Sequence, residues 1–116
     1  MRIIFTKHFF ERYTERISKI DGSHIFECNG KEYVKIESVE REIRKGSFYA
    51  NKRNLHNILI LYNNLKIYRG EVCNINGEEV LVIGTVYPYR KTHRGWINYH
   101  FERIYDFSKI WFLSSS

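Results

Sequence analysis

The amino-acid sequence predicts an α+β domain in which two N-terminal helices pack on an antiparallel sheet of about four strands. Two stretches within the first 45 residues carry apolar side chains at helical spacing. Residues 56–87 carry β-rich runs separated by Asn-containing turns, which favours an antiparallel meander. The 116 residues suit a single domain over residues 1–116, with an inserted hairpin (23–36) and a C-terminal extension (89–116).

The first helix is predicted over residues 6–20. Phe9, Tyr13, Ile17 and Ile20 recur at three- and four-residue spacing and form one apolar stripe. Thr6 is a residue type that caps helix starts, because its side-chain oxygen can accept a hydrogen bond from the first turn. We therefore expect the stripe to face the core and the charged side chains beside it to form a polar flank.

Residues 23–36 are predicted to form a hairpin, because Asn29-Gly30 suits a type I′ turn, in which both central residues need positive φ. A short second helix is expected next, with Ser38 as its cap. This helix should run to about Lys45 and end at Gly46.

The following segment is predicted to be a three-stranded meander. Its turns are Asn63-Asn64 and Asn76-Gly77, and residues 48–53 supply a further edge strand in this prediction. The three strands are expected over residues 56–62, 65–75 and 78–87.

Beyond Pro88 the pattern changes. Residues 89–95 predict a basic loop, and residues 96–112 mix aromatic with charged side chains. Their apolar spacing suggests a helix, with β structure as the alternative. Residues 114–116 are expected to form a frayed tail.

Composition narrows the class of partner. The 19 Lys and Arg residues exceed the 13 Asp and Glu residues, which gives a net charge of +6. Such a charge suits nucleic acid, an anionic membrane or an acidic protein, although a soluble protein that is simply basic fits equally well. No run of 18 apolar residues occurs, so no membrane span is expected. With two Cys residues and no secretory pattern, a cytoplasmic protein is the simplest expectation.

No metal or cofactor is expected. The five His residues show neither HxH nor HxxxH spacing, and the two Cys residues do not form a CxxC pair. The sequence contains no phosphate-binding loop, no dinucleotide fingerprint and no serine nucleophile motif.

Three short motifs carry a resemblance to a known family. They are HFFERYTERI at residues 8–17, VEREIRKG at residues 39–46 and TVYP at residues 85–88. In this order they resemble the small phage and mobile-element domains of the RelE, barnase, EndoU and colicin nuclease assemblage. The resemblance implies a RelE-like core over residues 5–88. The hairpin and the segment after Pro88 depart from the family pattern, and either could have given the domain a different use.

The resemblance also implies a function and its partners. It points to a metal-independent endoribonuclease that acts on RNA by 2′-hydroxyl attack, located in the host cytoplasm if phage-encoded. A host protein or a neutralising antitoxin is a further possible partner. The alternative is a non-enzymatic, phage-encoded binding protein that occupies a host nucleic-acid or protein site.

Candidate catalytic residues come from the first helix and the last strand. Metal-independent RNA cleavage needs a base, an acid and a cation that stabilises the phosphorane. His8, Arg12 and Arg16 share one helical face, and we predict His8 as general acid or base and either Arg as the cation. Thr85 and Tyr87 project to one side of their strand and would position phosphate or ribose. The competing interpretation is a solvated helix flank, with Tyr87 packed in the core.

A second group of residues predicts nucleic-acid binding through cations for phosphate and rings for base stacking. His93 in this group is also a second candidate for proton transfer. A solvated loop whose aromatic side chains pack on the core fits the same residues. The group comprises Arg53, Arg69, Arg90, Lys91, His93, Arg94 and Trp96.

Overall fold

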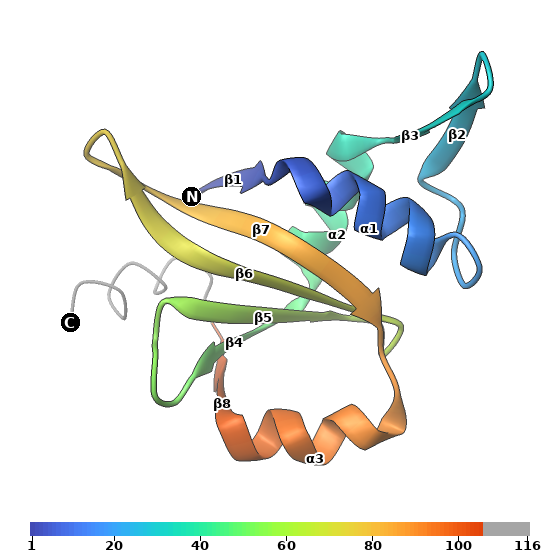
Figure 1. Cartoon of the computed structure of the whole chain (residues 1–116). Helices are drawn as coiled ribbons and strands as arrows, with labels where there is room; N and C mark the ends of the chain where they lie inside the picture. Colours follow the sequence, from blue (N-terminus) through green and yellow to red (C-terminus); the bar gives the residue numbers. More distant parts are fainter. Residues whose placement is uncertain (106–116) are drawn as a thin grey trace.

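The computed structural model describes residues 1–105 of the chain. It contains three helices and two sheets within that range, and Figure 1 shows their arrangement. In chain order the elements are β1 (Arg2–Phe5), α1 (Lys7–Ile17), β2 (Ile25–Cys28), β3 (Lys31–Val34), α2 (Ile36–Lys45), β4 (Ser47–Asn51), β5 (Asn57–Tyr62), β6 (Lys66–Ile75), β7 (Glu78–Pro88), α3 (Lys91–His100) and β8 (Phe101–Ile104).

The main sheet has six strands in the order β1-β7-β6-β5-β4-β8. β1 pairs with β7 in parallel, and the other neighbours are antiparallel. The hairpin β2–β3 forms a separate two-stranded sheet, which projects from the rest of the molecule beyond α1 (Figure 1). The first strand of the chain therefore lies beside a strand that comes more than 70 residues later.

The predicted fold class is wrong in its architecture. The helices are not confined to the N-terminal part, because α3 follows the last strand of the meander, and the sheet has six strands and is mixed. β1 and β8 have four residues each, which is too short to show a periodicity in the sequence. Both are strands because they pair with distant segments, β1 with β7 and β8 with β4.

Local predictions were more accurate. The hairpin over residues 23–36 and the meander are confirmed, and both central residues of each Asn-containing turn have positive φ, as a type I′ turn requires. The predicted cap of α2 is wrong, because the helix begins at Ile36 and Lys35 occupies the cap position instead of Ser38. Gly46 ends α2 as predicted.

The predicted basic loop is also wrong, because its residues from Lys91 onward form the first half of α3. Both structures considered for the following segment occur, since α3 ends at His100 and β8 begins at Phe101. Residues 106–112 of that prediction, and the tail at 114–116, lie outside the described residues.

Helices cover both faces of the main sheet. α1 and α2 pack on one face and form the larger core with it, while α3 packs on the other face over a smaller core. The smaller core contains Leu59, Ile67, Ile97 and Phe101. The face that bears α3 is called the second face below. Among residues 1–105, no helix combines the length and apolar character that crossing a bilayer requires.

Candidate functional site

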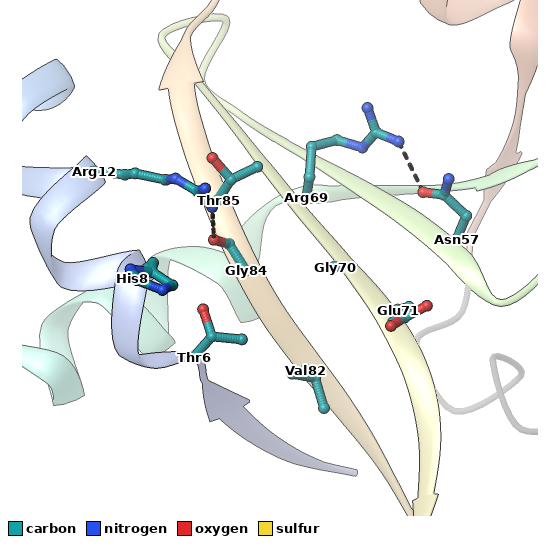
Figure 2. A pocket seen from close by; sticks show the side chains of 10 residues that line it. All are labelled: Thr6, His8, Arg12, Asn57, Arg69, Gly70, Glu71, Val82, Gly84 and Thr85. Carbon is teal, nitrogen blue, oxygen red and sulfur yellow. Dashed lines mark hydrogen bonds between the residues drawn. The ribbon is translucent and has the colours of Figure 1, made fainter.

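A hollow of about 490 Å³ opens on the second face of the sheet, over β5, β6 and β7 and beside the start of α1 (Figure 2). It is called the Arg69 hollow below. The side chains around it are mostly polar or charged, and they come from segments far apart in the sequence. Its lining consists of Thr6, His8, Arg12, Asn57, Arg69, Gly70, Glu71, Val82, Gly84 and Thr85.

A β-bulge at Gly84 shapes this hollow. Thr85 pairs with Arg69 and Ile83 pairs with Gly70, so Gly84 has no partner residue on β6. As a result Ile83 and Val86 both face the larger core although they are three residues apart. The bulge turns Thr85 toward the hollow and Tyr87 toward the smaller core on the same face.

Hydrogen bonds and ring contacts hold the Arg69 side chain in place on the second face of the sheet. Its Nη2 donates a hydrogen bond to Oδ1 of Asn57 at 2.8 Å, and its Nη1 donates to the Tyr87 hydroxyl at 3.4 Å. The guanidinium carbon lies 5.5 Å from the ring centroid of Trp96 and 5.0 Å from that of Phe101. Four neighbours from three strands and α3 therefore fix the guanidinium, leaving no need for it to reorganise when an anion binds.

Arg12 and Arg16 hydrogen-bond to the backbone of β7 beyond the point where its pairing with β1 ends. The last backbone bond of that edge runs from the Thr6 N–H to the Ile83 carbonyl at 3.0 Å. Beyond it Arg12 Nη1 donates to the Gly84 carbonyl at 2.8 Å, and Arg16 Nη1 donates to the Val86 carbonyl at 3.2 Å. Both guanidinium groups thus satisfy carbonyls that an unpaired strand edge would leave open.

The two arginines differ in their access to the hollow. Arg12 lines it, whereas Arg16 does not and instead donates a second bond to Thr85 Oγ1 at 3.0 Å. Arg12 and Arg16 hydrogen-bond to backbone carbonyls of β7, whereas Arg69 hydrogen-bonds to side chains and lies on the sheet surface that lines the hollow.

His8 and Glu71 lie on opposite sides of the hollow, with Gly70 and Gly84 between them (Figure 2). His8 is in the first turn of α1 and exposed, and its Nδ1 lies 3.7 Å from Glu11 Oε2. Glu71 is an exposed residue of β6, two positions after Arg69, so alternation places both on the same face. Sequence reasoning missed Glu71 and Asn57, and the two-residue spacing from Arg69 was the signal for Glu71.

His93 does not line the Arg69 hollow, and its Nδ1 is engaged in a hydrogen bond to the backbone. Its ring centroid lies 5.5 Å from that of Tyr87, and its Nδ1 accepts a hydrogen bond from the Arg90 N–H at 2.8 Å. The backbone N–H is the donor, so Nδ1 carries no proton and the neutral ring is protonated at Nε2. This bond caps the start of α3, and a second proton on His93 would break it.

The remaining residues that were predicted to bind nucleic acid lie at different places on the structure. Trp96 stacks over Arg69 and is 37% exposed. Arg90 and Lys91 are exposed at the start of α3, and Arg53 is exposed in the turn between β4 and β5, away from the hollow lining. Arg94 lines a different hollow beside α3. The structure thus brings His8, Arg12, Arg69 and Thr85 together, with Tyr87 and Trp96 in contact with Arg69.

A buried ionic cluster on the α1–α2 side of the sheet escaped sequence reasoning. Lys66 is fully buried, and its Nζ donates to Asp21 Oδ2 at 2.8 Å, to Glu42 Oε1 at 2.9 Å and to the Tyr13 hydroxyl at 3.2 Å. Glu42 also accepts from the Tyr68 hydroxyl at 2.8 Å. These side chains come from α1 and the loop after it, from α2 and from β6, so the cluster joins both helices to the sheet.

The pKa values in this cluster follow from burial and from the hydrogen bonds. Burial of Asp21 opposes its ionisation, but the hydrogen bonds from Lys66 and Ser23 outweigh it and lower its pKa. Burial of Lys66 likewise opposes its charge, but the bonds to Asp21, Glu42 and Tyr13 raise its pKa. Burial raises the pKa of Tyr68, and the nearby Tyr13 and Glu42 add to that effect. The cluster is therefore ionic near neutral pH.

No three His, Cys, Asp or Glu side chains within residues 1–105 lie close enough together to hold a metal ion. No family model, curated protein or solved structure significantly matches the chain. Function is therefore inferred from the geometry of the Arg69 hollow.

Proposed function

We propose that the chain binds single-stranded RNA on the second face of its sheet and cleaves it without a metal ion, by attack of the ribose 2′-hydroxyl. The observation that carries this proposal is the position of the Arg69 guanidinium in a hollow that also receives His8 and Glu71 from opposite sides. This is also the activity implied by the resemblance to the RelE, barnase, EndoU and colicin nuclease assemblage.

Arg69 holds the scissile phosphate in this proposal. A planar guanidinium can bind two phosphate oxygens at once and stabilise the extra negative charge of the phosphorane. Asn57, Tyr87 and Trp96 already hold it in place. Arg12, which lines the same hollow, adds positive charge without leaving the Gly84 carbonyl.

Glu71 and His8 supply proton transfer. The Glu71 carboxylate takes the proton of the 2′-hydroxyl, whose oxygen attacks phosphorus, and the protonated His8 ring gives its proton to the departing 5′-oxygen. The entering and leaving oxygens lie on opposite sides of phosphorus, so a base and an acid on opposite sides of the hollow suit the reaction (Figure 2). The products are a 2′,3′-cyclic phosphate and a free 5′-hydroxyl.

Aromatic side chains beside the hollow favour a single strand as substrate. Trp96 is exposed over Arg69, and Tyr99 is exposed on the same helix. Exposed rings stack on unpaired bases, whereas the bases of a duplex are already stacked. The net charge of +6 attracts the RNA backbone without regard to sequence.

A direct test is incubation of a single-stranded RNA with the protein in excess EDTA, with end-group determination on the products. Fragments that carry 2′,3′-cyclic phosphate and 5′-hydroxyl ends are expected. RNA that is bound, as a gel shift shows, but remains intact over hours would contradict the catalytic part of the proposal.

A binding protein without catalytic activity is the alternative function. The observation that favours it is the exposure of the His8 ring, whose one ion-pair partner within residues 1–105 is Glu11 at 3.7 Å. A catalytic group is usually held in position by its neighbours. In this alternative Arg69 and Trp96 bind RNA and His8 is dispensable.

A further inference from the structure

A second hollow, of about 370 Å³, lies on the same face of the sheet where β5 ends and α3 crosses it. It shares no lining residue with the Arg69 hollow. Its aliphatic lining residues are Leu61 from β5 and the buried Ile97 from α3. It is called the Asn98 hollow below.

Two tyrosine rings also line the Asn98 hollow. Tyr49 comes from β4 and Tyr89 from the segment between β7 and α3, and both are half-buried. The guanidinium carbon of Arg103 lies 5.5 Å from the Tyr49 ring centroid, and the His93 ring lies 6.0 Å from that of Tyr89. Both rings are therefore held in place and offer a surface on which a flat base can stack.

Two asparagine side chains and one arginine side chain complete the lining of the Asn98 hollow. Asn64, from the turn between β5 and β6, and Asn98, from α3, have no side-chain hydrogen bond within the described residues. An amide side chain offers both a donor and an acceptor, which is the pattern on the edge of a nucleobase. Arg94 adds an exposed cation at the same place, suited to a neighbouring phosphate.

A row of rings connects the two hollows. Arg69 donates to the Tyr87 hydroxyl at 3.4 Å, and the His93 ring lies 5.5 Å from Tyr87 and 6.0 Å from Tyr89. Each step is no longer than the spacing of neighbouring phosphates along an extended strand, so a strand of several nucleotides can reach both hollows.

We propose that the Asn98 hollow binds one unpaired nucleobase of the RNA strand whose phosphate lies at Arg69, with the tyrosine rings stacking on the base and the Asn amides reading its edge. This inference rests on the proposed RNA binding and deepens it, because it makes the protein sensitive to the base at one position. A surface that bound only phosphates would show no such sensitivity.

The test uses 2′-O-methyl decaribonucleotides, which lack the attacking hydroxyl and so stay intact. Oligomers of A, of C and of U, and an abasic decamer of the same charge, are titrated by fluorescence anisotropy. The wild-type chain is expected to bind the oligomers with bases about five- to 100-fold more tightly than the abasic one and to discriminate among the three bases. Asn98→Ala should remove much of the discrimination and leave the abasic Kd unchanged.

Matched variants separate this inference from the proposed function. Thr92→Ala changes an exposed residue of α3 that lines neither hollow, and it should keep the base discrimination. Arg69→Ala should weaken all four oligomers by a similar factor. Equal Kd values for all four oligomers would overturn the base subsite and leave RNA binding standing. A wild-type chain that binds none of them would overturn both.

Discussion

The Arg69 guanidinium donates a 2.8 Å hydrogen bond to the Asn57 side chain, which joins β6 to β5 on the second face of the sheet. Asn57 lines the same hollow without being a group that could move a proton in the proposed reaction. Its place beside Arg69 makes it a positioning residue, and this leads to the first prediction.

Asn57→Ala should raise the Kd for RNA about tenfold, because Arg69 loses one of the bonds that orient it toward phosphate. The free energy of unfolding should change by less than about 1 kcal/mol, since one hydrogen bond of a half-buried residue is removed. Anisotropy titration and urea denaturation of the same preparation measure the two quantities. An unchanged Kd would show that Arg69 is oriented without Asn57.

Arg12→Ala should destabilise the fold by about 1–2 kcal/mol, because the Gly84 carbonyl loses a charged hydrogen-bond donor at the edge of β7. The freed edge should also increase self-association, which analytical ultracentrifugation measures. Arg53→Ala is the matched control, since Arg53 is exposed in a turn. Equal urea midpoints for both variants would contradict the edge-capping role of Arg12.

Lys66→Met should destabilise the fold by about 3–5 kcal/mol, because it leaves the buried Glu42 carboxylate without its cation. Adding Glu42→Gln to Lys66→Met should recover part of that loss, since the remaining buried side chain is then neutral. Urea denaturation of the two single variants and the double variant measures the coupling. Additive losses would contradict a direct ionic interaction between the two residues.

Stability should be greatest between about pH 4 and pH 10 as far as this cluster is concerned. Asp21 has a lowered pKa in the fold, so its contribution is complete above its ordinary value of 3.8 and is lost as the pH falls further. Lys66 has a raised pKa, so its contribution is complete below 10.5 and is lost as the pH rises further.

Thermal unfolding across this pH range checks the prediction. In Lys66→Met the fall of the melting temperature below about pH 4 should be shallower than in the wild type, because Asp21 no longer has the cation that lowers its pKa. If the melting temperatures of both proteins fall equally steeply below about pH 4, the Lys66–Asp21 pair is not the origin of the acid sensitivity.

Sequence reasoning succeeded where structure depends on neighbours along the chain. Phe9, Tyr13 and Ile17 of the predicted stripe face the larger core, whereas Ile20 lies beyond the end of α1 and is exposed. The Asn-Gly dipeptides form their turns because few other residues tolerate positive φ there. It failed where a segment takes its structure from a distant partner. β1 and β8 are strands through their pairing with β7 and β4, and Lys66 is buried because two carboxylates from other elements meet it.

The candidate site likewise has features that the local sequence predicts and features that depend on distant segments. The predicted meeting of His8 and Arg12 with Thr85 agrees with the lining of the Arg69 hollow, whereas Arg16 and Tyr87 do not line it. The Gly84 bulge, which decides the side to which Thr85 turns, depends on pairing with β6 and has no local signature. The position of the Arg69 guanidinium between two rings was also hidden, because those rings come from α3 and β8.

Cleavage of a single-stranded RNA in EDTA by His8→Ala and Glu71→Gln tests the central claim most directly. Their matched controls are His100→Ala and Glu15→Gln, which change exposed residues outside the Arg69 hollow. We predict that each hollow variant loses at least about 100-fold in cleavage rate with an RNA Kd within a few-fold of wild type, and that each control retains full activity. Cleavage by His8→Ala at the rate of His100→Ala would contradict the proposed mechanism.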